Sequence, residues 1–355
     1  MDIRYHRLAN ILVNYSTRVR RGEKVLIYMI EPEAMPLVQE VYKETIKAGG
    51  LAEVYFTSTY LERALLQYGS DEQIRWVPEV DRWSIDWADV WIGIRAIRNP
   101  YELHDIPPDR LAAHSAVLGQ LSGIRVDSTR WVICRVPTEA FAQKAEMSLD
   151  EATDFFFNAT VRDWENESKQ WAQWKDAFQQ AKEVRIVGRE TDLIFSTEGR
   201  TYILANGDKN IPDGEFFTAP VETSVEGRIY FEFPGLYLGR KIHGIRLEFQ
   251  GGKVVQASAD NDVELLHRAL DTDEGSRFIG EFGVGVNYGI DRYVYETLFD
   301  EKMGGTIHLA LGRAYKENGG VVESNLHWDI VKDLRQEGEI WLDGRKVFER
   351  GKFLI

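Results

Sequence analysis

Short apolar segments alternate with longer amphipathic segments from residue 1 to about residue 150. The apolar runs predict buried strands at 22–30, 52–59, 88–96 and 130–137. Periodic apolar positions predict helices at 7–19, 34–49 and 109–120. Strands that are apolar on both faces and are separated by helices are typical of a mostly parallel sheet with helices packed on it.

The pattern changes twice farther along the chain. Residues 138–182 contain almost no glycine or proline and predict a helical stretch. From about residue 184, alternating apolar and polar residues between glycine turns predict an antiparallel sheet, with one helix inserted at 261–271. A chain of 355 residues exceeds one ordinary core. We therefore expect an α/β and α+β protein, with an N-terminal α/β domain at 1–160 and a mixed or antiparallel β-rich domain at 161–355.

Composition narrows the possible partners. The 57 acidic and 43 basic residues give a net charge of −14, which repels nucleic acid and anionic membrane surfaces. No stretch of the sequence approaches the ~20 apolar residues of a membrane-spanning helix, and the N-terminus lacks the apolar block of a signal peptide. Cys134 is the only cysteine, which fits a reducing compartment. These features predict a soluble cytoplasmic protein that binds neither nucleic acid nor membrane.

Two of the seven histidines, His308 and His327, fall within residues 304–330. On a strand, His327 and Asp329 would point to the same face, and Trp328 would point away from it. Imidazole and carboxylate groups on converging strands are the donors that zinc, cobalt or manganese ions select. A buried histidine with ordinary hydrogen-bond partners is the commoner case, so these residues alone leave both interpretations open.

Two acidic residues in apolar surroundings strengthen the metal interpretation. Glu215 follows a proline–glycine turn, and Glu281 lies in a strand otherwise made of apolar residues and glycine. A carboxylate in such a place pairs with a base or binds a metal. With Asp329 and two neutral histidines, these groups carry three negative charges, which two divalent ions and one bridging hydroxide neutralise. Two metal ions therefore fit the set better than one.

Four motifs in the second half of the chain occur together in a characteristic order. They are "IPDGEFFTAPVETSVEG", "IGEFGVGVN", "DEKMGGTIHLALGRAY" and "ESNLHWDIVKD". In order and spacing they resemble the thermophilic metalloaminopeptidases of the aminopeptidase T and aminopeptidase S type, which are leucyl aminopeptidase-like. The chain departs from that pattern in being shorter, and in having "DEK" where asparagine more often follows "DE".

The resemblance implies a site as well as a fold. It implies a binuclear metal centre in the C-terminal domain, an N-terminal α/β domain and a homodimer. Tyr315 would lie beside the centre, and Glu301 belongs to the segment that departs from the family pattern. The implied metal ligands are Glu215, Glu281, His308, His327 and Asp329.

Motifs for other hydrolases and for nucleotide binding are absent from the sequence. No H-E-x-x-H and no G-x-S-x-G occurs, which removes the main support for a mononuclear zinc protease or a serine hydrolase. The glycines of "GEFGVGVNYG" lack the G-x-G-x-x-G spacing. Cys134 lies in an apolar run that disfavours a reactive thiolate.

The sequence thus predicts a metal-dependent aminopeptidase that releases N-terminal residues from peptides with a two-metal activated water. Glu281 is the first candidate for the group that accepts the water's proton, and Glu301 is the second. Tyr315 would donate a hydrogen bond to the developing oxyanion or complete a metal shell. Two alternatives remain: a metal-dependent amidase acting on another amide, and a non-catalytic peptide-binding relative.

Overall fold

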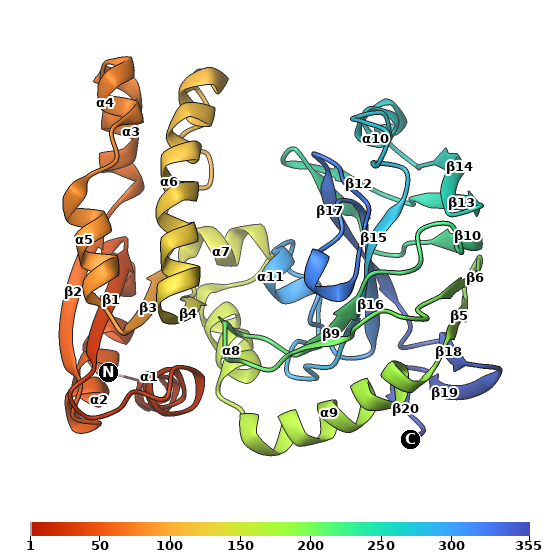
Figure 1. Ribbon diagram of the computed structural model, residues 1–355, viewed down its shortest axis with the longest axis horizontal. Coiled ribbons are helices and arrows are strands. Elements are labelled where there is room, and N and C mark those ends of the chain that lie inside the picture. The colour runs from red at the N-terminus through yellow and green to blue at the C-terminus, as the bar shows by residue number, and fades with distance from the viewer. Residues whose placement is uncertain (1) are drawn as a thin grey trace. The chain divides into compact units, whose positions relative to one another are not determined.

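The chain forms two compact units in the computed structural model, which describes residues 2–355 (Figure 1). The first unit runs to Trp164 and also contains Gly207–Pro212. The second unit comprises Glu165–Asn206 and Asp213–Ile355.

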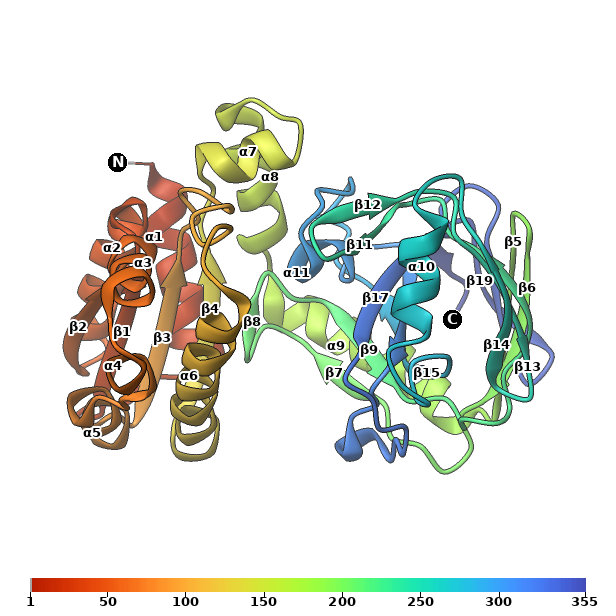
Figure 2. The same ribbon diagram turned by 90° about the horizontal axis from the view of Figure 1, so that it is seen from above.

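A five-stranded sheet in the order β2-β1-β3-β4-β8 forms the centre of the first unit (Figure 2). Its strands are β1 (Lys24–Ile30), β2 (Leu51–Thr57), β3 (Val90–Arg95), β4 (Arg130–Arg135) and β8 (Asn210–Ile211). Every pair of neighbours is parallel, which confirms the parallel sheet expected from the apolar runs. The strand β8 comes from a distant part of the sequence. It was not predicted, because a strand of only two residues has no recognisable sequence pattern.

Helices join the strands of this sheet and cover it. Successive residues of β1 are buried: Val25 and Ile27 point to one face, and Leu26 points to the other. Helix α2 packs on β1 and β2, α5 packs on β1, and α6 packs on β4. The helices are α1 (Ile3–Asn10), α2 (Met35–Lys47), α3 (Thr59–Tyr68), α4 (Asp71–Arg75), α5 (Glu79–Trp87), α6 (Pro108–Ser128), α7 (Glu139–Lys144) and α8 (Leu149–Thr160), with a π-helix at Ile11–Ser16 and a 3-10 helix at Pro32–Ala34.

The second unit begins with most of helix α9 (Trp164–Gln180) and is built on antiparallel sheets, as expected. The larger sheet has the order β14-β13-β10-β6-β5-β18-β19-β20. Its strands are β5 (Glu183–Gly188), β6 (Thr191–Ser196), β10 (Glu226–Tyr230), β13 (Arg246–Gln250), β14 (Lys253–Ser258), β18 (Glu339–Leu342), β19 (Arg345–Glu349) and β20 (Lys352–Phe353).

A five-stranded sheet in the order β17-β16-β15-β9-β7 carries the residues of greatest chemical interest. Its strands are β7 (Ile203–Ala205), β9 (Glu215–Thr218), β15 (Ile279–Gly285), β16 (Thr306–Gly312) and β17 (His327–Asp333). The unit also contains the hairpin β11 (Gly235–Tyr237) and β12 (Arg240–Ile242), helices α10 (Val263–Leu270) and α11 (Thr297–Asp300), and a 3-10 helix at Lys316–Asn318.

Aromatic side chains form the core between these two sheets and helix α9. The Phe282 ring of β15 lies 5.0 Å from the Phe195 ring of β6, and Phe178 of α9 lies 4.9 Å from Phe216 of β9. Because strand residues alternate between faces, Glu215 and Glu281 point away from this core. One face of the five-stranded sheet is therefore buried in the apolar core, and the opposite face carries the polar side chains of Glu215 and Glu281.

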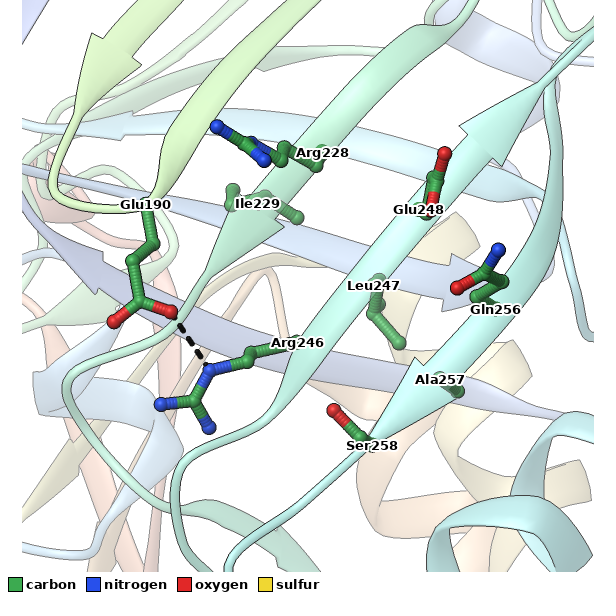
Figure 3. A pocket seen from close by; sticks show the side chains of 9 residues that line it. All are labelled: Glu190, Arg228, Ile229, Arg246, Leu247, Glu248, Gln256, Ala257 and Ser258. Atoms are coloured by element: carbon green, nitrogen blue, oxygen red, sulfur yellow. Dashed lines mark hydrogen bonds and ion pairs between the residues drawn. The ribbon is translucent and has the colours of Figure 1, made fainter.

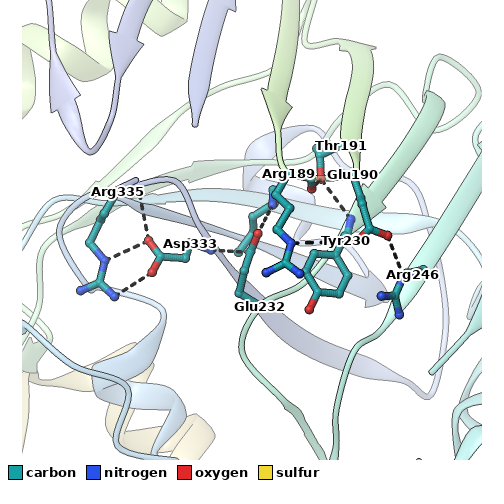
Figure 4. Close-up of polar contacts among 9 residues, drawn as sticks. Arg189, Glu190, Thr191, Tyr230, Glu232, Arg246, Asp333 and Arg335 are labelled. Atoms are coloured by element: carbon teal, nitrogen blue, oxygen red, sulfur yellow. Dashed lines mark hydrogen bonds and ion pairs between the residues drawn. The ribbon is translucent and has the colours of Figure 1, made fainter. Parts of the chain in front are cut away.

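A buried ion pair links β17 to the segment after β10. The ammonium of Lys332, whose side chain is fully buried, lies 2.8 Å from Glu232 Oε1. The other Glu232 oxygen accepts a hydrogen bond from the backbone N–H of Asp333, and Asp333 in turn pairs with Arg335 (Figure 4). Burial lowers the pKa of Lys332, and the charge of Glu232 opposes that effect.

Replacing Glu232 with alanine should destabilise the fold, because it leaves a buried ammonium without its counter-charge. We expect a loss of unfolding free energy on the order of 2–3 kcal/mol, since Glu232 itself is partly exposed. Chemical denaturation of the purified variant measures it. Glu198→Ala is the matched control: Glu198 pairs with Lys182 on the surface, and such pairs contribute ~0–1 kcal/mol. Equal stability of the two variants would contradict the structural role of Glu232.

Candidate metal centre

Four neighbouring strands bring the predicted ligand residues to one face of the five-stranded sheet. Ala310 of β16 pairs with Glu281 of β15 on one side and with Asp329 of β17 on the other, so the two carboxylates flank it. His308 lies two residues before Ala310, and His327 lies two residues before Asp329, so both share that face. The apolar residues between them, Leu309 and Trp328, point to the opposite face and are buried. The expected placement of His327 and Asp329 on one strand face is therefore observed.

Glu281 lies at the centre of this group of side chains. Its Oε1 is 3.2 Å from His308 Nε2, and its Oε2 is 3.7 Å from His327 Nε2. Asp329 Oδ2 lies 3.7 Å from the same nitrogen of His327. One donor atom from each of Glu281, His327 and Asp329 can be chosen so that all lie within 4.8 Å of one another. These spacings suit donors that surround a common cation.

Glu215 extends the group on the side of β9. Its Oε2 lies 3.6 Å from His308 Nε2 and, although buried, has no hydrogen-bond partner among residues 2–355. A buried carboxylate oxygen without a partner is costly, and a cation would supply one. Its Oε1 lies 3.2 Å from the ammonium of Lys302.

Both histidines are oriented by backbone carbonyls. The Nδ1 atom of His308 lies 3.1 Å from the carbonyl oxygen of Glu301, and Nδ1 of His327 lies 2.8 Å from that of Arg313. Because a carbonyl oxygen only accepts, these contacts assign the proton of the neutral ring to Nδ1. The Nε2 lone pairs then face the carboxylates, which is the orientation that metal-binding histidines adopt.

Gly283 provides the space that His308 occupies. The two residues pair directly across β15 and β16. A Cβ atom at Gly283 would lie 2.0 Å from Cε1 and 2.2 Å from Nε2 of the His308 ring. The glycine within an otherwise apolar strand is therefore required by the imidazole on the next strand. This role of Gly283 was not predicted from the sequence, because it depends on the register between β15 and β16.

Lys302 is a second residue that the sequence analysis missed. Its side chain is buried and contacts the carboxylates of both Glu215 and Glu301. Burial alone would lower the pKa of Lys302, but the charges of Glu215 and Glu301 outweigh it and raise the pKa. Lys302 therefore stays charged and offsets the charge of Glu301. The negative charge that remains is that of Glu215, Glu281 and Asp329, the three carboxylates of the predicted ligand set.

Two carboxyl groups of the cluster have raised pKa values. Burial raises the pKa of Glu215 to about 8, against the opposing charge of Lys302. Burial and the charge of Glu301 raise the pKa of Asp329 to about 6. Buried oxygens and imidazole nitrogens of this kind fit divalent ions such as zinc, cobalt or manganese.

Tyr315 and Glu301 lie beside the cluster. The Tyr315 ring is 5.2 Å from the His327 ring and 6.1 Å from the Phe217 ring. Burial of the hydroxyl, together with the charge of Glu281, raises the pKa of Tyr315 to about 12. The phenol is therefore protonated at neutral pH and can donate a hydrogen bond. The carboxylate of Glu301 is held against Lys302.

A hollow on the larger sheet has different chemistry. It is lined by residues of β10, β13 and β14 and by Glu190, which pairs with Arg246 at 2.8 Å (Figure 3). The nine residues drawn there include no histidine, cysteine or tyrosine. The face of β9, β15, β16 and β17, by contrast, carries the histidine and carboxylate side chains described above.

Comparison with known proteins assigns the family. The family described as thermophilic metalloprotease (M29) matches residues 1–353. This chain belongs to the thermophilic metalloprotease (M29) family. The match confirms the resemblance inferred from the four motifs, and family membership implies a divalent metal cofactor.

Individual M29 relatives match over nearly their whole length. Aminopeptidase 2 of Geobacillus stearothermophilus is 27% identical over 97% of this chain and 96% of its own. Aminopeptidase T of Thermus thermophilus is 27% identical over 98% of each chain. The solved structure of wild-type AmpT from Thermus thermophilus superposes with a TM-score of 0.83 over 99% of both chains, at 23% identity. The chain therefore has the fold of wild-type AmpT.

Proposed function

We propose that this chain is a metal-dependent aminopeptidase that removes N-terminal residues from peptides. The observation that carries the proposal is the group of donor atoms from Glu281, His327 and Asp329 within 4.8 Å of one another. It lies on the polar face of a sheet whose other face is the core. The M29 relatives named aminopeptidase support the choice of peptide substrates with a free N-terminus.

We propose two divalent ions, zinc, cobalt or manganese, as the cofactor. Glu215, Glu281 and His308 would hold one ion, and Glu281, His327 and Asp329 would hold the other. The charge count supports this number, because Lys302 offsets Glu301 and leaves three carboxylates uncompensated. Such ions supply Lewis acidity, polarising a carbonyl group and lowering the pKa of water.

The side chains around the ions would handle the proton and the developing charge. Glu281 and Glu301 are the two carboxylates proposed to accept a proton, and Lys302 holds Glu301 in place. Tyr315 would donate its phenolic proton in a hydrogen bond to the oxygen that becomes negative when the peptide carbonyl is attacked. The surplus of carboxylates would also attract the ammonium group of the substrate.

Tyr315→Phe should lower kcat by about 10²–10³-fold, the usual effect of removing one oxyanion donor. The metal content and the thermal stability should stay near those of the wild type, because Tyr315 as a whole is 38% exposed and the change removes a single oxygen atom. Steady-state kinetics and metal analysis measure both quantities. An unchanged kcat would show that Tyr315 only packs beside His327.

Activity should fall as the pH drops below about 6, near the ordinary pKa of histidine. Without an ion, burial would lower the pKa of His308, but the hydrogen bond to Glu281 and the charge of Glu215 raise it to about 10. Protons and metal ions therefore compete for Nε2, and lower pH favours the protonated ring. Excess metal should move the acid limb of the pH–rate profile to lower pH. If the acid limb stayed at the same pH when the metal concentration was raised, protons and metal ions would not be competing for Nε2.

Hydrolysis of capped and uncapped peptides tests the proposed activity. A peptide beginning with leucine should release free leucine, detected by mass spectrometry, and chelator should stop the release. The same peptide with an N-acetyl group should be a poor substrate, because it lacks the ammonium group. Equal cleavage of both peptides would indicate an endopeptidase or another amidase. No cleavage of either by the metal-loaded protein would favour a non-catalytic peptide-binding relative.

The assembly and location proposed for the chain are a homodimer and the cytoplasm. The homodimer rests on the family resemblance, and light scattering of the purified protein tests it. The cytoplasmic location rests on the single cysteine, Cys134, which is buried. Among the described helices, none combines the length and apolar composition that a membrane crossing requires.

A further inference from the structure

A cavity of about 350 Å³ lies within the first unit, on one face of the parallel sheet. Its lining includes Ile30, Thr57 and Arg95, the last residues of β1, β2 and β3, together with residues of α3, α5 and α6. Strands β2 and β3 lie on opposite sides of β1, so the chain changes direction across the sheet at this point. In open α/β sheets, ligands bind outside the carboxyl ends of the strands at such a switch point.

Two guanidinium groups in this cavity, those of Arg95 and Arg125, form no ion pair with a carboxylate among residues 2–355. Arg125 is only 7% exposed, and its Nη1 has no hydrogen-bond partner in the described chain; Arg95 Nε is likewise buried without a partner. Arg125 Nη2 donates a hydrogen bond to the Ser122 hydroxyl at 3.1 Å. Burial lowers the pKa of Arg125 to about 10, and the nearby charge of Arg95 contributes. An anion between the two groups would remove this cost.

The N-terminus of helix α3, which borders the cavity, is already occupied by the protein's own carboxylate. Glu31 Oε1 accepts from the backbone N–H of Thr59 at 2.6 Å, and Oε2 accepts from the Ser58 hydroxyl at 2.7 Å. Phosphate sites in α/β folds commonly use such a helix terminus. With that position filled, the groups left in the cavity that can carry positive charge are the two guanidinium groups, which match a carboxylate in two-point geometry, and the imidazole of His114.

One part of the cavity lining is aromatic and aliphatic, and includes Tyr28, Trp91, Ile85 and Leu121. The rings of Tyr28 and Trp91 stack at 5.4 Å, and the guanidinium of Arg125 lies 4.8 Å from the Trp91 ring. Ile85 and Leu121 complete these walls. A cavity of this size that combines apolar side chains with polar groups able to fix the orientation of a ligand is typical of small-molecule sites.

From these features we propose that the switch-point cavity binds a small organic carboxylate with an aromatic or branched apolar body. The carboxylate pairs with Arg95 and Arg125, and the body lies against Tyr28 and Trp91. Such a molecule can be a plain carboxylic acid or a free amino acid. Glu62 also lines the cavity, with its Oε1 3.7 Å from His114 Nε2, and its carboxylate would receive the ammonium group of an amino acid. The site belongs to the first unit and does not depend on the aminopeptidase assignment.

Isothermal titration calorimetry on the full chain, treated with chelator so that the metal centre binds no carboxylate, tests the proposal. The probes are 3-phenylpropanoate, L-phenylalanine and 2-phenylethylamine. The acid should bind with one site per chain, and the amine, which lacks a carboxylate, should not bind. If L-phenylalanine binds more tightly than the acid and Glu62→Gln removes the difference, the ligand class is amino acids. If the acid binds at least as tightly, it is plain carboxylic acids.

Arg95→Gln and Arg125→Gln should each weaken binding of 3-phenylpropanoate at least about tenfold, the usual loss for one charged hydrogen bond. Arg82→Gln is the matched control, because Arg82 is exposed on α5 and pairs with Asp86 on the surface. Circular dichroism identifies any variant that fails to fold, and Arg95→Gln leaves the Arg125–Trp91 contact in place. The proposal is overturned if neither 3-phenylpropanoate nor L-phenylalanine binds at millimolar concentration. It is also overturned if a folded Arg95→Gln protein binds them as the wild type does.

Discussion

His327→Ala and Asp329→Ala should each reduce peptide hydrolysis by at least about 10³-fold, with the fold intact. Each change removes one donor of the group that also includes Glu281. Metal ions contribute several kcal/mol to such reactions, and each 1.4 kcal/mol is tenfold in rate. The two side chains lie at the polar face of β17, so their removal opens no cavity in the aromatic core.

Metal analysis, circular dichroism and initial rates on the two variants measure these effects. His243→Ala is the matched control, because His243 is an exposed histidine of the same unit that is not part of the donor group. It should retain wild-type metal content and activity. Near-normal turnover with full metal occupancy in either His327→Ala or Asp329→Ala would remove that residue from the site.

Gly283→Ala should nearly abolish activity although it changes no ligand. The added methyl group would lie 2.0 Å from the His308 ring, so the imidazole must move. A displacement of about 1 Å in an active site commonly costs 10²-fold in rate, and here the displaced group is a proposed ligand. The variant should therefore also bind less metal.

Gly188→Ala provides the control for placing alanine in a strand of the same unit. Its Cβ would meet its nearest neighbour, Lys332 Cε, at an ordinary 3.5 Å. Rates and metal content should stay near the wild-type values in this variant. If Gly283→Ala behaved in the same way, the orientation of His308 would not matter for activity.

The fold was predictable from the sequence where a pattern extends over several residues. The runs at 22–30 and 88–96 each contain several consecutive apolar residues, 25–30 and 90–94, which is typical of strands covered on both faces, and these runs form β1 and β3. Strand β8 has two residues, and its pairing with β4 depends on chain path, not on local pattern.

The candidate site was predictable where residue type and spacing alone indicate a ligand. A histidine and an aspartate two residues apart indicate one strand face, and the structure brings His327 and Asp329 together. Gly283 and Lys302 carried no such signal. The first is explained by the ring on the neighbouring strand, and the second by the burial of its ammonium between Glu215 and Glu301. Both depend on which strands become neighbours.

The Arg95–Arg125 pair escaped the sequence analysis for the same reason. One arginine ends a strand and the other lies near the end of a helix. Isolated arginines in a sequence usually indicate surface positions. Only the packing of α6 on the sheet shows that these guanidinium groups are buried in one cavity.

An anomalous difference map from crystals of the zinc-loaded protein, collected at the zinc absorption edge, tests the proposed metal centre most directly. Two peaks should appear on the polar face of β9, β15, β16 and β17, one between Glu215 and His308 and the other between His327 and Asp329, with Glu281 between the peaks. A single peak would retain the metal-dependent enzyme and remove the two-ion proposal. No peak at this face, or peaks held only by residues of the first unit, would contradict the proposed centre.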